Sequence, residues 1–185
     1  MIKRLFTVVL LLSLVLCTGY RKPYRYTIRA EKDAFYHNNV GLNHLRDRIY
    51  YAAIQEFKIA ISLSPSTQAS AIFYNNLGET YNFIGYPDMA KDCFENAIQL
   101  YGLNFKYYQN LVECYINIGQ AEKKIAEYKD SNDVYARIQL GLLYIQTGEK
   151  RKGVNVLDEL CSEEPDLMIT PAIRQYIKEV IQEGI

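Results

Sequence analysis

Apolar and polar positions follow a helical period along most of this chain. The clearest segment is 50–65, where one helix face is predicted from apolar and small residues spaced three or four apart. These residues are Ala53, Phe57, Ala60 and Ile61. Pro65 has no backbone N–H, so the helix is expected to end before it. The spacing recurs through the rest of the chain, so the pattern predicts an all-α fold.

A second segment, residues 71–104, shows this spacing twice with a turn at Gly85. Its expected first helix carries Tyr74, Leu77, Gly78 and Tyr81, and its expected second helix carries Ala90, Phe94 and Ala97. Large and small residues therefore alternate on two faces that meet. Such a pattern predicts a helical hairpin in which a small residue on one helix receives a large one from the other.

The segment resembles the tetratricopeptide repeat, a helix-turn-helix unit of about 34 residues. The resemblance implies an α-α superhelix, or solenoid, of about four hairpins over residues 34–168, with approximate repeats at 34–67, 71–104, 105–133 and 134–167. The third unit is shortened and carries Lys124 where the family has a small residue. Counted back from Pro65, the first helix is expected at about residues 34–47, with Gly41 in the small position.

Residues 169–185 are predicted to form a capping helix. Thr170 and Pro171 fit an N-cap and a first helical position. An apolar stripe is expected behind them, formed by Ile173, Ile177, Val180 and Ile181. Because a repeat array exposes an apolar end, a last helix with a polar outer face is needed there.

The start of the chain resembles an export signal. Lys3 and Arg4 precede an apolar run from Leu5 to Leu16, which is shorter than the roughly 20 residues that span a bilayer. The end of this run resembles a bacterial lipobox, which implies a signal peptide over residues 1–17 and a lipid on Cys17. The alternatives are a cut after Gly19, for which Cys17 and Gly19 supply the small residues at the third and first positions before the cut, and an uncleaved anchor.

Residues 18–33 are interpreted as a tether leading into the first helix. Its stretch from Tyr20 to Arg29 holds four cations and no acid, which suits an anionic membrane surface as well as water. We therefore expect an exported protein of the bacterial cell envelope or periplasm, anchored to a membrane as a lipoprotein.

Charge and motif content disfavour several functions. The chain has 21 basic and 21 acidic residues, whereas nucleic-acid binding needs clustered cations. No catalytic or phosphate-binding motif is recognisable, so we expect no enzyme and no cofactor. His37 and His44 are seven residues apart and so share one face of a helix, which offers a metal site. This is the least favoured alternative, because both occupy aromatic packing positions of the repeat. The cysteines after Cys17 lack metal-ligand spacing and are expected to be buried thiols.

Protein binding is the function that the resemblance implies. In this family the first helices of successive hairpins line a concave groove, which corresponds here to Asn38, Leu42, Asn75, Asn76, Glu79, Lys106, Gln109, Asn110, Glu113, Gln139 and Leu142, together with Phe83. Amides suit a peptide segment or helix of a partner. We expect a non-catalytic scaffold for other envelope proteins, with no small-molecule substrate; an accessory subunit that positions a cell-wall enzyme is the alternative.

Overall fold

The computed structural model describes residues 33–184, and all regular structure in that range is α-helical. The helices, in chain order, are α2 (Ala34–Arg46), α3 (Tyr50–Leu63), α4 (Gln68–Phe83), α5 (Pro87–Leu100), α6 (Phe105–Asn117), α7 (Ala121–Tyr128), α8 (Val134–Gln146), α9 (Lys150–Glu163) and α10 (Thr170–Gln182). The all-α prediction is confirmed. Within these residues no helix combines the length and apolar character that crossing a membrane requires.

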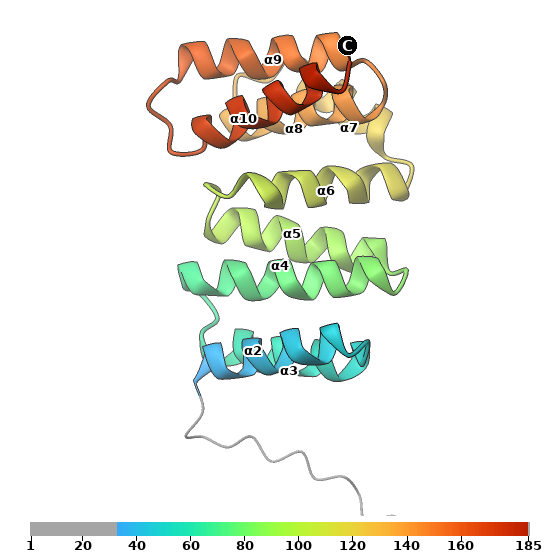
Figure 1. The fold of residues 1–185 in the computed structure, drawn as a ribbon, viewed down its shortest axis with the longest axis vertical. Helices are drawn as coiled ribbons and strands as arrows, with labels where there is room; N and C mark the ends of the chain where they lie inside the picture. The colour runs from blue at the N-terminus through green and yellow to red at the C-terminus, as the bar shows by residue number, and fades with distance from the viewer. Residues whose placement is uncertain (1–32, 185) are drawn as a thin grey trace, which may run out of the picture. The chain divides into compact units, whose positions relative to one another are not determined.

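Neighbouring helices pair as hairpins, and the hairpins stack one after another. Helices α2 and α3, α4 and α5, and α8 and α9 make the most extensive contacts. Figure 1 shows α2, α4 and α6 running in the same direction, stacked along the long axis of the described part. This is the arrangement of an α-solenoid, in which each hairpin contacts its neighbours in the chain.

The first helix of each hairpin begins with a side-chain cap, and the second helix does not. Asp33, Thr67, Asn104 and Asp133 each accept a hydrogen bond from a backbone N–H of the helix that follows. Within each hairpin the turn contains one residue of positive φ, which is Arg48, Gly85, Gly119 or Gly148. Caps and turns therefore repeat with the hairpins, and each sets where its helix starts.

Three hairpins are closed by a glycine facing a large side chain. A Cβ added to Gly41 would lie 2.6 Å from the Phe57 ring, and one on Gly78 would lie 2.7 Å from the Phe94 ring. A Cβ on Gly141 would lie 2.5 Å from Leu157 Cγ. The missing side chains let the two helices approach until the large residue fills the space between them.

The third hairpin differs from the others. Val112, fully buried, stands where those hairpins have glycine, and α7 contributes no buried residue. Lys124 lies with its Nζ 5.2 Å from the ring centres of both Tyr115 and Tyr128, and it pairs with Glu127 at 3.0 Å. A valine keeps the helices further apart than a glycine does, and a long lysine stem covers the aromatic rings in place of close helix contact.

Helix α10 covers the end of the array, with two differences from the predicted cap. Thr170 is inside the helix and its hydroxyl donates to the Glu164 carbonyl at 2.8 Å, while Ile169 occupies the N-cap position. The Thr170 prediction is therefore wrong, because the preceding loop offers this hydroxyl an acceptor. Ile181 is also outside the apolar stripe, since it is 51% exposed.

Helix α8 is buried on almost every side. It contacts α6, α7 and α9, and its buried residues include Ile138, Leu142 and Leu143. Helix α10 reaches both neighbours of α8: Tyr176 packs against Phe105 of α6 with ring centres 5.4 Å apart, and Arg174 donates to the Cys161 carbonyl of α9 at 3.1 Å. A largely apolar helix needs cover on most sides, and α6, α7 and α9 provide it by direct contact with α8.

Candidate protein-binding face

The surface formed by α2, α4 and α6, called here the first-helix face, holds most of the groove residues predicted from sequence. Helix α4 is central and presents one stripe of residues three or four apart, namely Ile72, Asn76, Glu79 and Phe83. The stripe is apolar at both ends and polar in the middle.

Buried amides join the three helices of this face. Asn76 donates to Asn38 of α2 at 2.8 Å. Asn110 of α6 donates to Asn75 at 2.9 Å and to Glu79 at 3.0 Å, both on α4. Amide groups buried without a partner would be costly, so these bonds both satisfy the side chains and fix the spacing of the helices.

A second set of contacts joins α4 and α6 nearer to the turns. Asn82 donates to Glu113 at 3.2 Å, and Asn117 donates to Asn82 at 3.5 Å. The predicted lining therefore bonds largely to itself from one hairpin to the next. The sequence predicted Glu113 as a groove residue but not Asn82 or Asn117. It assigned the amides of the predicted asparagines to a partner, because pattern alone does not show which amides face each other.

The predicted groove residues differ in their access to water. Buried members are Asn38, Asn75, Asn76 and Asn110, half-buried members are Glu79 and Gln109, and exposed members are Leu42, Lys106 and Glu113. A partner can thus reach a carboxylate, an amide, an ammonium group and an apolar side chain on this face. The buried asparagines lie beneath that surface and hold it.

Gln139 and Leu142 of α8 do not lie on the accessible face. Leu142 has 0% of its surface exposed, and the Gln139 side chain donates to the Tyr135 carbonyl at 3.2 Å while its Oε1 is buried. The expectation that Leu142 lines an open groove is wrong. The physical reason for this error is that neighbouring helices cover α8, so the fourth hairpin is not part of the candidate surface.

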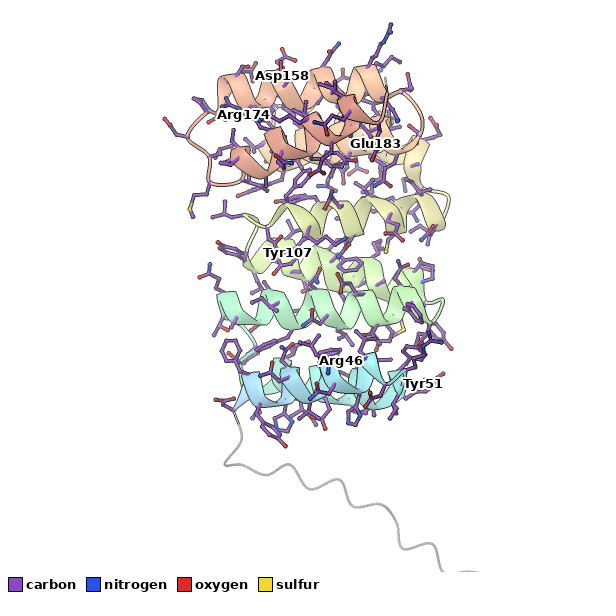
Figure 2. The ribbon with its side chains drawn as sticks, in the orientation of Figure 1. Arg46, Tyr51, Tyr107, Asp158, Arg174 and Glu183 are labelled. Carbon is purple, nitrogen blue, oxygen red and sulfur yellow. The ribbon has the colours of Figure 1, made fainter. Side chains whose placement is uncertain are left out.

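Two exposed apolar residues mark the ends of the α4 stripe. Ile72 is 45% exposed and Phe83 is 68% exposed, with its ring centre 5.0 Å from that of Tyr50. In Figure 2, Tyr107 lies on the side where α4 and α6 begin, and Tyr51 lies on the opposite side, where α2 ends. We call these the start edge and the turn edge of the face.

A pocket of about 300 Å³ opens at the start edge. It is lined by Phe35, Gln68, Ala69, Ile72, Tyr101, Asn104 and Tyr107. Tyr107 is almost fully buried, and burial raises the pKa of its hydroxyl above the usual 10.0. This pocket was not predicted from the sequence, although Phe35 and Ile72 are apolar at the second position of their repeats, which faces the groove in this family.

His37 is part of the first hairpin rather than of a metal site. Its Nδ1 lies 2.7 Å from Glu56 Oε2, and both side chains are buried. His44 lies further along α2 and is half-buried. Across residues 33–184, no group of three or more histidine, cysteine or acidic residues gathers in a way that fits a metal ion. The pairing of His37 with Glu56 gives this histidine a packing role.

The three cysteines of the array are buried free thiols, as the sequence predicted. Burial raises the pKa of Cys93 to about 12, with a smaller effect from Asp92, and burial likewise raises the pKa of Cys114 to about 12. A thiolate is the reactive form, so neither thiol is suited to nucleophilic or redox chemistry near pH 7.

Comparison with known proteins agrees with this architecture. Residues 71–102 match the family profile of the tetratricopeptide repeat. No curated protein sequence matches the chain. A tetratricopeptide repeat protein from Parabacteroides merdae ATCC 43184 shares the fold with a TM-score of 0.51 at 16% identity, over 81% of this chain and 60% of that one.

Two further structures show a weaker likeness. MamA aligns with a TM-score of 0.48 at 21% identity, over 71% of this chain and 73% of that one. A tetratricopeptide repeat protein from Thermus thermophilus aligns with a TM-score of 0.46 at 20% identity, over 82% and 83% of the two chains. With the profile match at residues 71–102 and the likeness to the Parabacteroides protein, the described helices form an all-α solenoid of the tetratricopeptide repeat type.

Proposed function

We propose that this protein is a non-catalytic scaffold whose first-helix face binds a segment of a partner protein. The observation that carries the proposal is the face itself. Its buried asparagines fix α2, α4 and α6 relative to one another, while Ile72 and Phe83 stay exposed on either side of them. A surface that is already ordered loses little conformational entropy on binding, and exposed apolar groups are what a partner would cover.

The proposal includes a location in the bacterial cell envelope. Its support is the charged start, the short apolar run and Cys17, all of which lie outside the described residues. Lipid on Cys17 would hold the array near a membrane, and the partners would then be other envelope proteins.

Site-specific photo-crosslinking in intact cells tests the binding face. A crosslinking amino acid at Lys106 or Gln109 samples the first-helix face, and one at Lys123 of α7 or Lys178 of α10 samples exposed residues elsewhere. We expect a discrete crosslinked partner from the first two positions only. Products from Lys123 and Lys178 alone would place the interface on another surface and contradict the proposal.

A further inference from the structure

The stripe on α4 specifies the kind of segment that fits the first-helix face, if that face binds a partner as proposed above. Ile72 and Phe83 are eleven residues apart, which is three helical turns and about 16 Å along the helix axis. Both therefore point to the same side of α4, with Asn76 and Glu79 between them.

A partner helix matches this spacing better than an extended segment. Along a helix lying beside α4, residues i and i+11 are again about 16 Å apart and share one face. An extended chain covers that distance in about five residues, and side chains five apart point to opposite faces of a strand. The helix therefore matches the spacing of the two edges with its apolar side chains on one face, whereas a strand shares a face only at about 13 or 20 Å.

The charges between the two edges indicate which charge the partner carries at the matching positions. Glu79 and Glu113 lie on neighbouring helices, and each accepts one asparagine hydrogen bond. Among the described residues neither carboxylate forms an ion pair. Two cations of this face stand toward its edges: Lys106 in the first turn of α6, seven residues before Glu113, and Arg46 in the last turn of α2. The middle of the face is therefore acidic and complements a basic residue.

We infer that the first-helix face binds an amphipathic helix of a partner protein, with apolar residues at i and i+11 and lysine or arginine at i+4 and i+7. One apolar side chain enters the pocket at the start edge beside Ile72, and the other packs on Phe83 and Tyr50 at the turn edge. The basic residues lie over Glu79 and Glu113. The buried amides keep the three helices in place and do not contact the partner.

A synthetic peptide tests this inference on the full chain. The probe is an alanine-rich helix of about 20 residues, with leucine at i, lysine at i+4 and i+7, and tryptophan at i+11. Because the protein has no tryptophan, tryptophan fluorescence reports on the peptide alone. We expect saturable binding, weakened at least about tenfold when the two apolar residues are moved to i and i+9, on opposite helix faces, or when both lysines become glutamates.

Variants of the protein locate the bound peptide. Ile72→Ser and Phe83→Ser should each weaken binding about tenfold, whereas Ile181→Ser, a matched change at an exposed residue of α10, should not. Glu79→Gln with Glu113→Gln keeps an oxygen that accepts the asparagine bonds and should remove the salt dependence of binding. If a serine variant is misfolded by circular dichroism, the comparison of peptides on the unaltered protein still decides the result.

The outcomes separate this inference from the proposed function. Absence of saturable binding up to about 1 mM peptide, or equal binding by the peptide with anchors at i and i+9, overturns the inference. So does tighter binding by an extended peptide with apolar residues four or six apart, which share one face of a strand, or a dimer in sedimentation that is lost in Phe83→Ser. If crosslinks from Lys106 and Gln109 persist in those cases, the binding face stands and only the helical partner is wrong.

Discussion

At the scale of single residues, Arg48 has the least favourable backbone in the described part of the chain. Its φ is 61°, while the equivalent turns use Gly85, Gly119 and Gly148. A side chain in this left-handed region costs about 1–2 kcal/mol. We predict that Arg48→Gly raises the free energy of unfolding by about 1 kcal/mol, and that Gly148→Arg lowers it by a similar amount. Urea unfolding measures both, and an effect of the same sign in the two variants would contradict the prediction.

Gly78 tests the close approach of the two helices in the second hairpin. The Phe94 ring fills the space where a side chain on Gly78 would project. Gly78→Leu must push the helices apart, so we predict a loss of about 1–3 kcal/mol or more in the free energy of unfolding. Ala126→Leu on the exposed side of α7 is the control and should change it by under about 0.5 kcal/mol. An unchanged thermal midpoint for Gly78→Leu would contradict the close contact described between Gly78 and Phe94.

The buried thiols make the fold sensitive to alkali. Cys93 and Cys114 have folded-state pKa values of about 12, against 9.0 when unfolded. Above pH 9 the unfolded chain therefore loses thiol protons that the folded chain keeps, and the free energy of unfolding falls as pH rises. The slope per thiol approaches about 1.4 kcal/mol per pH unit between these values.

We predict that this fall begins near pH 9. Buried tyrosines contribute only at higher pH, because their pKa in the unfolded chain is 10.0. Cys93→Ala with Cys114→Ala should reduce the slope between pH 9 and pH 10, although the variant is less stable at pH 7. Denaturant unfolding at several pH values provides the measurement. An unaltered slope in the double variant would show that other groups cause the alkaline destabilisation.

At the scale of helices, the apolar pattern predicted where most elements lie. Small and large residues at fixed spacing report both faces of a hairpin, so Gly78 with Phe94 could be paired from sequence alone. The apolar pattern of a helix does not show which other helix covers each of its faces. Leu142 has the spacing of a groove residue, yet the helices packed around α8 bury it completely.

Helix α10 offers a matched pair of isoleucines that tests its role. Ile177 is 7% exposed and belongs to the core, whereas Ile181 is 51% exposed on the same helix. We predict that Ile177→Ala lowers the free energy of unfolding by about 2–5 kcal/mol and that Ile181→Ala changes it by under about 0.5 kcal/mol. Thermal and urea unfolding compare the two. Equal effects would mean that α10 is not packed as described.

At the scale of the whole molecule, the solenoid was predictable and its binding chemistry was only partly so. The repeat places Asn75, Asn76 and Asn110 on the first helices, which the sequence shows. Their mutual hydrogen bonds depend on the offset between neighbouring hairpins, and that offset follows from packing over the entire array. The pocket at the start edge was missed for the same reason, since the first helices of three successive hairpins and the loop before α6 all contribute to it.

Membrane attachment is the remaining question at this scale, and it depends on residues 1–32, outside the described part. We predict that the mature chain begins at a lipid-modified Cys17 and fractionates with membranes, because one acyl anchor with four nearby cations binds an anionic bilayer more firmly than either does alone. Cys17→Ser should move the protein to the soluble fraction, whereas Cys93→Ser, a buried thiol of the array, should not. Mass analysis of the N-terminal peptide decides the cleavage site: a free Tyr20 terminus without lipid would show that the signal is cut after Gly19, and the array would then reach its partners without an anchor.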